Sequence, residues 1–336
     1  MNFFYINKCI ISSMKFIKCY KKGWRYLDKS KFYTNRLNII IIAIICTFLW
    51  GSAFPAIKVG YEIFNIASSD VGAKLIFAGY RFFLAGIIVL IIKLLMKQSI
   101  FDLTFKDMKE ITILGLGQTT LQYIFFYLGM TYTTGVRGSI INGTGTFFSI
   151  ILAHFIYKND KLNFNKILGC IVGFAGVIIV NLGGSSVLEG GFSFKGEGFI
   201  MLAAFMLSIS SIYSKKISQN KDAYTITGYQ LAIGGLALIL IGYILEGNLT
   251  NFNIKSTSLL LYMALLSSVA FALWSQLLKY NKVGVISVFN FLIPVFGTIL
   301  SAIVLKENIF DIKILIALIL VCAGIYLVYK KKESVY

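Results

Sequence analysis

One arginine stands in the middle of a long apolar stretch of this chain. Arg81 lies in the sequence Gly-Tyr-Arg-Phe-Phe-Leu-Ala-Gly at 79–86, inside an apolar run from 72 to 95. Its guanidinium carries five N–H donors in a planar fork that suits a carboxylate. A charge at this depth needs a partner: helix carbonyls, tyrosines, an inorganic anion or a substrate carboxylate. A structural role, tying its helix to backbone near Gly51 and Pro55, stays open.

Other polar and aromatic side chains occur at similar depth in neighbouring apolar stretches. Gln118 and Gln122 are four residues apart and therefore share one face of a helix. Buried polar groups in a bilayer normally face the interior of the helix bundle, so we expect a polar, aromatic cavity. Hydrogen bonding between helices is the alternative for any single residue. The expected substrate-binding residues are Arg81, Trp50, Tyr80, Gln118, Gln122, Tyr127, Asn142, Gln230, Trp274 and Asn290.

The sequence offers no set of residues for catalysis or metal binding. The one histidine, His154, falls near the end of an expected span, where a structural role is favoured, and the five cysteines have no metal-ligand spacing. None of the 14 acidic residues lies in the middle of an expected span. The glycine-rich segment 115–123 lacks the strand and the Gly-Lys-Ser/Thr of a phosphate loop. We expect no catalytic residue, no metal and no cofactor, which disfavours a membrane enzyme.

The elements that must position these residues are membrane-spanning helices. The 336-residue chain is 57% hydrophobic and 14% charged, with a mean hydropathy of +0.80 and only two prolines. Soluble domains have about a quarter of their residues charged. A helix needs about 20 apolar residues to cross a bilayer. The expected class is an all-α integral membrane protein with ten spans: 38–59, 72–95, 110–130, 135–156, 163–183, 196–216, 222–245, 256–279, 283–305 and 310–329.

An internal repeat organises these spans into two halves. The stretch 79–86 recurs 149 residues later as 228–235, where Gln230 takes the place of Arg81, and the same offset pairs further residues along both halves. The halves are expected at 38–183 and 184–330. Because five helices are an odd number, the second half must enter the membrane from the opposite side. Inverted repeats of this kind are typical of transporters, with the substrate site near the midplane.

The net charge of +18 is distributed by membrane side. With the N-terminus inside, 24 basic residues lie on the inner side and 7 on the outer side, with Arg81 between them. The positive-inside rule therefore predicts that the arm 1–37 and the tail 331–336 are both cytoplasmic. The arm suits an anionic inner leaflet. The basic residues follow topology, so nucleic acid is not an expected partner, and a monomer is the expected state.

Glycine and proline mark expected hinges and packing contacts. Gly51 and Pro55 weaken the first span near its middle, and such breaks need protein or a cavity around them. The Gly-x-x-x-Gly pair of Gly169 and Gly173 suits close helix packing. Gly145 and Pro294 occupy equivalent places in the fourth and ninth spans. Two charged residues at span ends, Lys58 and Glu307, are weaker site candidates than Arg81 because they can reach the headgroups.

Several motifs resemble one transporter family. Trp50-Gly51-Ser52 with Lys58, and then Tyr80-Arg81-Phe82, look like the first two helices of the EamA branch of the drug/metabolite transporter superfamily. The segments 174–178, 304–307 and 323–327 resemble later helices of that family. The resemblance covers about residues 38–330. It implies export or exchange of small metabolites by a ten-helix permease.

The predicted function is secondary transport of a small amphipathic or zwitterionic metabolite, such as an amino acid, by alternating access. Efflux of drugs or organic cations by proton antiport is one alternative. The expected spans contain no mid-membrane carboxylate to carry the proton, which disfavours it. A structural or assembly role is the alternative from another class. The many Ile, Lys and Asn residues, with only four arginines, are typical of an AT-rich bacterial genome, so the expected location is the cytoplasmic membrane.

The charge distribution predicts that the C-terminus is cytoplasmic and that the segment between the two halves is external. Reporter fusions at Tyr336 and near Glu189 should therefore report opposite sides of the membrane. If both fusions report the same side, the inverted ten-helix arrangement is wrong.

Overall fold

The computed structural model describes residues 29–67, 69–133, 138, 141–181, 193–304 and 312–329. These residues form helices joined by short connections, and none of them lies in a strand. The elements are α2 (Arg36–Ile63), α3 (Val71–Leu95), α4 (Phe105–Gly115), η1 (Leu116–Leu121), α5 (Gln122–Thr131), α7 (Gly145–Ile156), α8 (Phe164–Asn181), η2 (Phe194–Gly198), α9 (Phe199–Ser218), α10 (Ala223–Ile244), α11 (Ile254–Tyr280), α12 (Val283–Ser287), η3 (Val288–Phe291), α13 (Leu292–Val304) and α14 (Ile312–Tyr329).

The helices have the length and composition of membrane spans. Within the described ranges, seven helical stretches are long and apolar enough to cross a bilayer, and shorter apolar helices cover 141–156, 164–179 and 315–329. Many large apolar side chains point outward along these helices, as lipid-facing positions require. The chain is therefore an all-α, multi-pass membrane protein, as its composition predicts.

Polar side chains define where the helices begin. Asn35, Asp70 and Asp222 each cap a helix by accepting hydrogen bonds from its first backbone N–H groups. Thr104 and Asp107 form a reciprocal capping box at the start of α4, which places that start five residues before the expected one. Such caps matter in a membrane protein because the first N–H groups of a helix have no partner within it.

Several of the spans are irregular in ways that hydropathy does not predict, and the sixth begins with the π-helical segment η2. The third expected span is one helical stretch with a π-helical segment, η1, in its middle. The ninth begins as α12, tightens into the 3₁₀ segment η3 and continues as α13. Pro294 lies in the first turn of α13, where a proline is tolerated. In contrast, α2 continues unbroken through Gly51 and Pro55, so the expected weak point does not end that helix.

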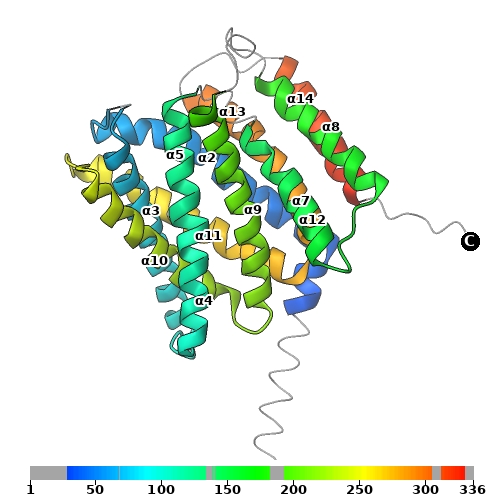
Figure 1. The fold of residues 1–336 in the computed structure, drawn as a ribbon, viewed down its shortest axis with the longest axis horizontal. Coiled ribbons are helices and arrows are strands. Elements are labelled where there is room, and N and C mark those ends of the chain that lie inside the picture. The colour runs from blue at the N-terminus through cyan, green and yellow to red at the C-terminus, as the bar shows by residue number, and fades with distance from the viewer. Residues whose placement is uncertain are drawn as a thin grey trace, which may run out of the picture.

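Helices that the 149-residue offset relates to one another pack against each other. Figure 1 shows α3 beside α10 at one side of the bundle and α8 beside α14 at the other, and these two pairs make the most extensive helix contacts in the described structure. Between the pairs, α2 contacts both α11 and α13, and α9 contacts both α5 and α7. A large cluster of buried apolar side chains lies where α2 and α11 meet α8, α13 and α14, and a smaller one lies between α4, α9 and α10.

Glycines allow the backbones of α3 and α10 to touch. A Cβ atom on Gly79 would lie 2.8 Å from the carbonyl oxygen of Gly235, and one on Gly86 would lie 2.5 Å from that of Gly228. The two contacts are equivalent under the 149-residue offset, because the offset relates Gly79 to Gly228 and Gly86 to Gly235. Without side chains at these points, the two helices approach more closely than larger residues would allow.

The other expected packing residues also lie in close contacts, with one exception. A Cβ on Gly169 would lie 2.6 Å from the carbonyl oxygen of Gly324, and one on Gly173 would meet the ring of Phe291. A Cβ on Gly51 would meet the Cβ of Phe296 on α13 at 2.7 Å. Gly145, at the start of α7, has only ordinary van der Waals contacts around its missing side chain.

We predict that Gly86→Ala destabilises the protein, although alanine is the better helix former. The added methyl group would lie 2.4 Å from the backbone nitrogen of Ala232, and overpacking of this kind costs about 1–3 kcal/mol. The matched control is Gly145→Ala, where the new methyl group would be 3.4 Å or more from its neighbours. Thermal unfolding in detergent should show a lower melting temperature for the first variant only; equal melting temperatures would contradict the close contact.

Candidate functional site

Arg81 is buried in the middle of α3, and only 2% of its surface is exposed. Its Nε donates a hydrogen bond of 2.7 Å to the Oγ of Ser267 on α11, and the Ser267 hydroxyl donates in turn to the carbonyl oxygen of Met263. The guanidinium also lies 4.9 Å from the centre of the Phe82 ring. Among the described residues, no carboxylate pairs with Arg81, and its hydrogen bond goes to α11 rather than to the backbone near Gly51 and Pro55.

Three tyrosines surround the guanidinium. The phenol groups of Tyr61, Tyr123 and Tyr127 lie within electrostatic reach of Arg81. The hydroxyl of Tyr61 is buried and makes no hydrogen bond of ordinary geometry to the described residues, although Tyr127 lies beside it. Burying a hydroxyl without a hydrogen-bond partner costs free energy. Unpaired groups of this kind are common at sites that bind polar ligands.

A continuous run of aromatic rings extends through this part of the bundle. Neighbouring rings have centroid distances between 4.5 and 6.1 Å, and most are inclined to each other, which is the favourable arrangement for aromatic pairs. The rings come from four helical elements, and in order they belong to Trp274, Trp50, Phe271, Phe82, Tyr123 and Tyr127. Of the expected site residues, the structure thus brings together Arg81, Trp50, Tyr127 and Trp274 through this run of rings.

The glutamine that replaces arginine in the second half occupies a comparable place. Gln230 on α10 is 2% exposed, and its Oε1 accepts a 3.0 Å hydrogen bond from Thr119 in η1. Arg81 and Gln230 therefore each hydrogen bond to a hydroxyl on the third helix of the opposite half. Gln118 and Gln122 are both buried in the same stretch, and their common face stays a prediction.

The remaining expected residues do not join this cluster through described contacts. Tyr80 lies with Tyr243, their hydroxyl oxygens 3.4 Å apart, and its ring lies against Phe252. Asn142 and Asn290 are half-buried, and Lys58 is exposed, as expected for a side chain at a span end. Glu307 lies outside the described residues.

Sequence reasoning missed two members of the site, Ser267 and Tyr61. Tyr61 follows the expected end of the first span at residue 59, whereas α2 continues to Ile63. Ser267 is an ordinary small residue in an apolar helix, but the 149-residue offset relates it to Gln118. The 149-residue offset was the one signal in the sequence for Ser267. It places Ser267 opposite Arg81 in the same way that η1 lies opposite Gln230.

Polar contacts gather at one end of the bundle, which we call the basic end and define by Tyr33, Lys93, Asp160, Lys215 and Asn281. Asn281 Nδ2 donates to the carbonyl oxygen of Tyr33, and Lys215 Nζ donates to that of Asn281. Lys93 Nζ lies 3.1 Å from the carboxylate of Asp222 at the start of α10. These contacts hold together the ends of helices from both halves of the chain.

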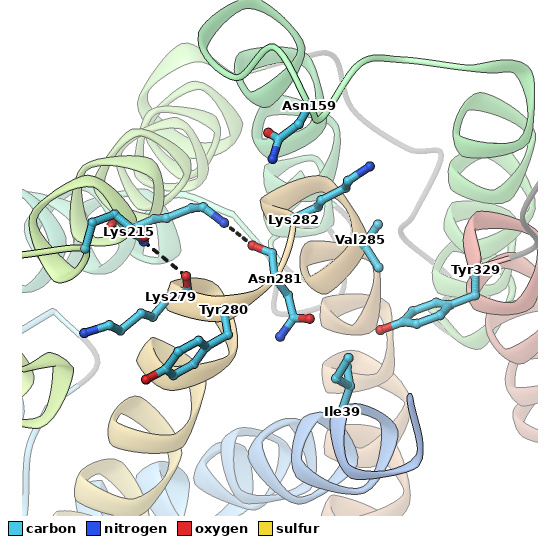
Figure 2. Close-up of a pocket in the computed structure, with 10 residues that line it drawn as sticks. Ile39, Asn159, Lys215, Lys279, Tyr280, Asn281, Lys282, Val285 and Tyr329 are labelled. Atoms are coloured by element: carbon cyan, nitrogen blue, oxygen red, sulfur yellow. Dashed lines mark hydrogen bonds between the residues drawn. The ribbon is translucent and has the colours of Figure 1, made fainter. Parts of the chain in front are cut away.

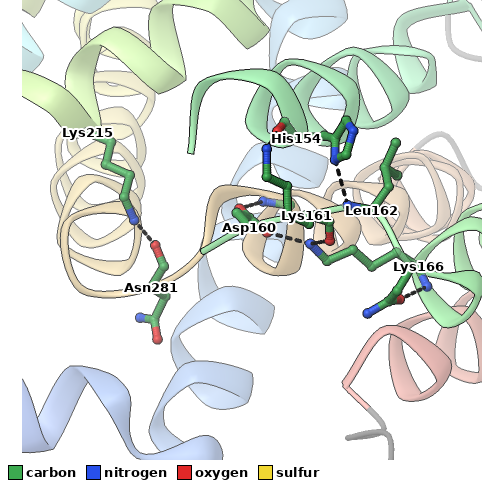
Figure 3. Close-up of polar contacts among 9 residues, drawn as sticks. His154, Asp160, Lys161, Leu162, Lys166, Lys215 and Asn281 are labelled. Atoms are coloured by element: carbon green, nitrogen blue, oxygen red, sulfur yellow. Dashed lines mark hydrogen bonds and ion pairs between the residues drawn. The ribbon is translucent and has the colours of Figure 1, made fainter. Parts of the chain in front are cut away.

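Asp160 is the centre of the buried network at the basic end (Figure 3). Its Oδ1 lies 2.5 Å from Lys166 Nζ, and its Oδ2 accepts a hydrogen bond of 2.9 Å from the backbone N–H of Gly284. Burial, with Asp160 nearby, raises the pKa of Tyr157 to about 12, so its hydroxyl stays protonated at neutral pH. Removing one partner of such a buried pair leaves an uncompensated charge, so we assign this network a structural role.

His154 makes local contacts that fit the structural role favoured by its place in the sequence. Its Nδ1 accepts a hydrogen bond of 3.0 Å from the backbone N–H of Leu162, and its carbonyl oxygen accepts one from Lys161 Nζ (Figure 3). Within the described ranges, no group of three or more His, Cys, Asp or Glu residues is placed to hold a metal ion.

Comparisons with known proteins agree with this picture. The model of the EamA-like transporter family matches residues 37–182 and 194–330. An "Uncharacterized transporter" of Archaeoglobus fulgidus is 26% identical over 293 residues, which cover 85% of this chain and 95% of that protein. The "Uncharacterized transporter YetK" of Bacillus subtilis is also 26% identical, over 76% of this chain and 78% of its own length.

A solved structure shares the fold. It superimposes with a TM-score of 0.71 and 15% sequence identity, covering 87% of this chain and 96% of that one. An identity this low supports the fold alone. The family model covers most of the chain, and the Archaeoglobus relative is aligned over 95% of its length. The chain is therefore a member of the EamA-like transporter family.

Proposed function

We propose that this protein is a secondary transporter, an exporter or exchanger, for small metabolites that carry a carboxylate and an apolar or ammonium-bearing part, such as amino acids. One observation carries the proposal: a buried guanidinium makes a single hydrogen bond, through Nε, to the described residues. Its terminal nitrogens, with the hydroxyl of Tyr61 nearby, are suited to a bidentate contact with a carboxylate.

The charge of the site supports a substrate that is not purely cationic. Three ion pairs join described residues, namely Lys93 with Asp222, Lys166 with Asp160 and Lys221 with Asp107, and none involves the cluster around Arg81. A cation would meet a positive charge without a countercharge, in surroundings where such repulsion is weakly screened. A carboxylate would instead offset the cost of burying the guanidinium.

The aromatic rings support an amphipathic substrate. Rings such as Trp50 and Phe271 offer apolar surface to a hydrocarbon side chain, and the faces of Trp and Tyr attract an ammonium group. A zwitterion thus finds a partner for each of its charges within one cluster. An inorganic anion uses the guanidinium only.

The proposed architecture is ten transmembrane helices in two inverted five-helix repeats, 38–183 and 184–330, that rock against each other. The two separate matches to the family model support it, as do the paired glycine contacts of α3 and α10. The proposed orientation has the arm 1–37, the tail 331–336 and the basic end in the cytoplasm, since 24 basic residues are assigned to that side and 7 to the other. The proposed partners are the solute and the anionic inner leaflet of a cytoplasmic membrane, with the protein acting as a monomer.

Arg81→Gln tests the substrate role of the guanidinium. Gln230 fills the equivalent position of the second half, so a glutamine should fit sterically. We expect the variant to insert and fold normally but to bind carboxylate-bearing ligands about tenfold more weakly or worse, because hydrogen bonds to charged groups contribute about 1.5–3 kcal/mol. The measurement is ligand-induced thermal stabilisation of the purified protein, screened with amino acids, organic anions and organic cations.

The exposed Lys58→Gln serves as the matched control, because it removes a positive charge outside the cluster. It should retain the wild-type ligand response. A ligand-free Arg81→Gln protein that is grossly destabilised would indicate a structural arginine. Unchanged affinity for every carboxylate that binds the wild type would end the proposal.

A further inference from the structure

A second feature with the properties of a binding site lies at the basic end, away from the Arg81 cluster. A cavity of about 520 Å³ opens between the ends of α2, α9, α11, α12 and α14 (Figure 2). This volume is within the range of about 300–1,000 Å³ that is usual for small-molecule sites. The lining residues are Ile39, Asn159, Lys215, Gln219, Lys279, Tyr280, Asn281, Lys282, Val285 and Tyr329. Both halves of the chain contribute to it.

The charge of the cavity wall has one sign. Three of the ten lining residues are lysines and none is acidic. Lys215 Nζ donates to the carbonyl oxygen of Asn281, which is a neutral acceptor, and Lys279 Nζ donates to the carbonyl oxygen of Lys221. Asp160 lies near Lys215, but its two oxygens are already occupied by Lys166 and by the N–H of Gly284.

Neutral donors complete the wall. Tyr329 points its hydroxyl into the cavity, and this buried oxygen has no hydrogen-bond partner among the described residues (Figure 2). Asn159 presents its side-chain amide from the top of the view in Figure 2. Arg36 lies 5.6 Å from the centre of the Tyr329 ring and adds a further positive charge at this end. The cavity therefore combines fixed cations with an unsatisfied buried hydroxyl, which is the chemistry that receives an oxyanion.

We propose that this cavity is a second binding site, and that it holds a phosphate or carboxylate group against Lys215, Lys282, Asn159 and Tyr329. It is separate from the proposed substrate site and does not depend on Arg81. The oxyanion has two possible sources, a free anion from solution or the headgroup of an anionic lipid. Both present the same charged oxygens, and an experiment can separate them.

Tyr329→Phe is the sharpest variant, because it removes one hydroxyl and keeps the ring. Lys215→Gln and Lys282→Gln each remove one positive charge from the wall. The matched controls are Tyr326→Phe, an exposed tyrosine on the same helix, and Lys216→Gln, the exposed neighbour of Lys215. Full-length proteins are compared, and only variants with a wild-type melting temperature in the absence of added anion enter the comparison.

The first arm titrates detergent-purified protein with inorganic phosphate against chloride at equal ionic strength and reads the melting temperature. The second compares nanodiscs of phosphatidylglycerol with nanodiscs of phosphatidylcholine. If the source is a free anion, phosphate stabilises the wild type, and the three cavity variants bind it about tenfold more weakly. If the source is a lipid, only phosphatidylglycerol stabilises the wild type, and the same variants lose that effect.

In either supporting case, the two surface controls and Arg81→Gln keep the wild-type response. Retention in Arg81→Gln distinguishes this site from the proposed substrate site, so one proposal can fail without the other. The cavity proposal is overturned if neither phosphate nor phosphatidylglycerol stabilises the wild type. It is equally overturned if the cavity variants respond as strongly as their surface controls.

Discussion

The organisation of this protein depends on the cost of holding a guanidinium inside a bilayer. Insertion scales put that cost at about 2.5–3.5 kcal/mol at the centre of a helix. Here it is reduced by a hydrogen bond from Arg81 to Ser267 and by the face of Phe82. The hydrogen bond requires α3 and α11 to be held close together, whereas Phe82 follows Arg81 on α3 itself. The packing of the surrounding helices therefore has a functional consequence, because it determines what the arginine can reach.

That packing rests on backbone contact between repeat-related helices. The glycines of α3 and α10 meet in two places, and the 149-residue offset relates one place to the other. The same kind of glycine contact therefore occurs twice. The polar residues carried on these helices have diverged, since Arg81 faces Ser267 whereas Gln230 faces Thr119. In the proposed inverted repeat, a symmetric scaffold would surround an asymmetric site, and the single positive charge of Arg81 would define one position for the proposed anionic group.

Much of the fold follows from simple features of the sequence, because hydrophobic length and helix caps are local properties. The apolar run 72–95, for example, corresponds to α3 within one residue. The site was less accessible to prediction, since it depends on which helices are neighbours. Arg81 stands out as a lone charge, but Ser267 becomes recognisable only when α11 is placed beside α3. The π-helical turn of η1 and the cavity at the basic end likewise depend on packing between distant segments.

The two positive regions differ in their physical roles. The lysines around the cavity lie at the end of the bundle, where water screens their charge and where they raise the local concentration of anions. Arg81 is buried, so its charge is weakly screened and a ligand must give up its own water to reach it. Charge alone would favour a small inorganic anion at both places. The aromatic run from Trp274 to Tyr127 alters that preference near Arg81. Its rings can contact an attached apolar or ammonium group favourably, and an inorganic anion has no such group.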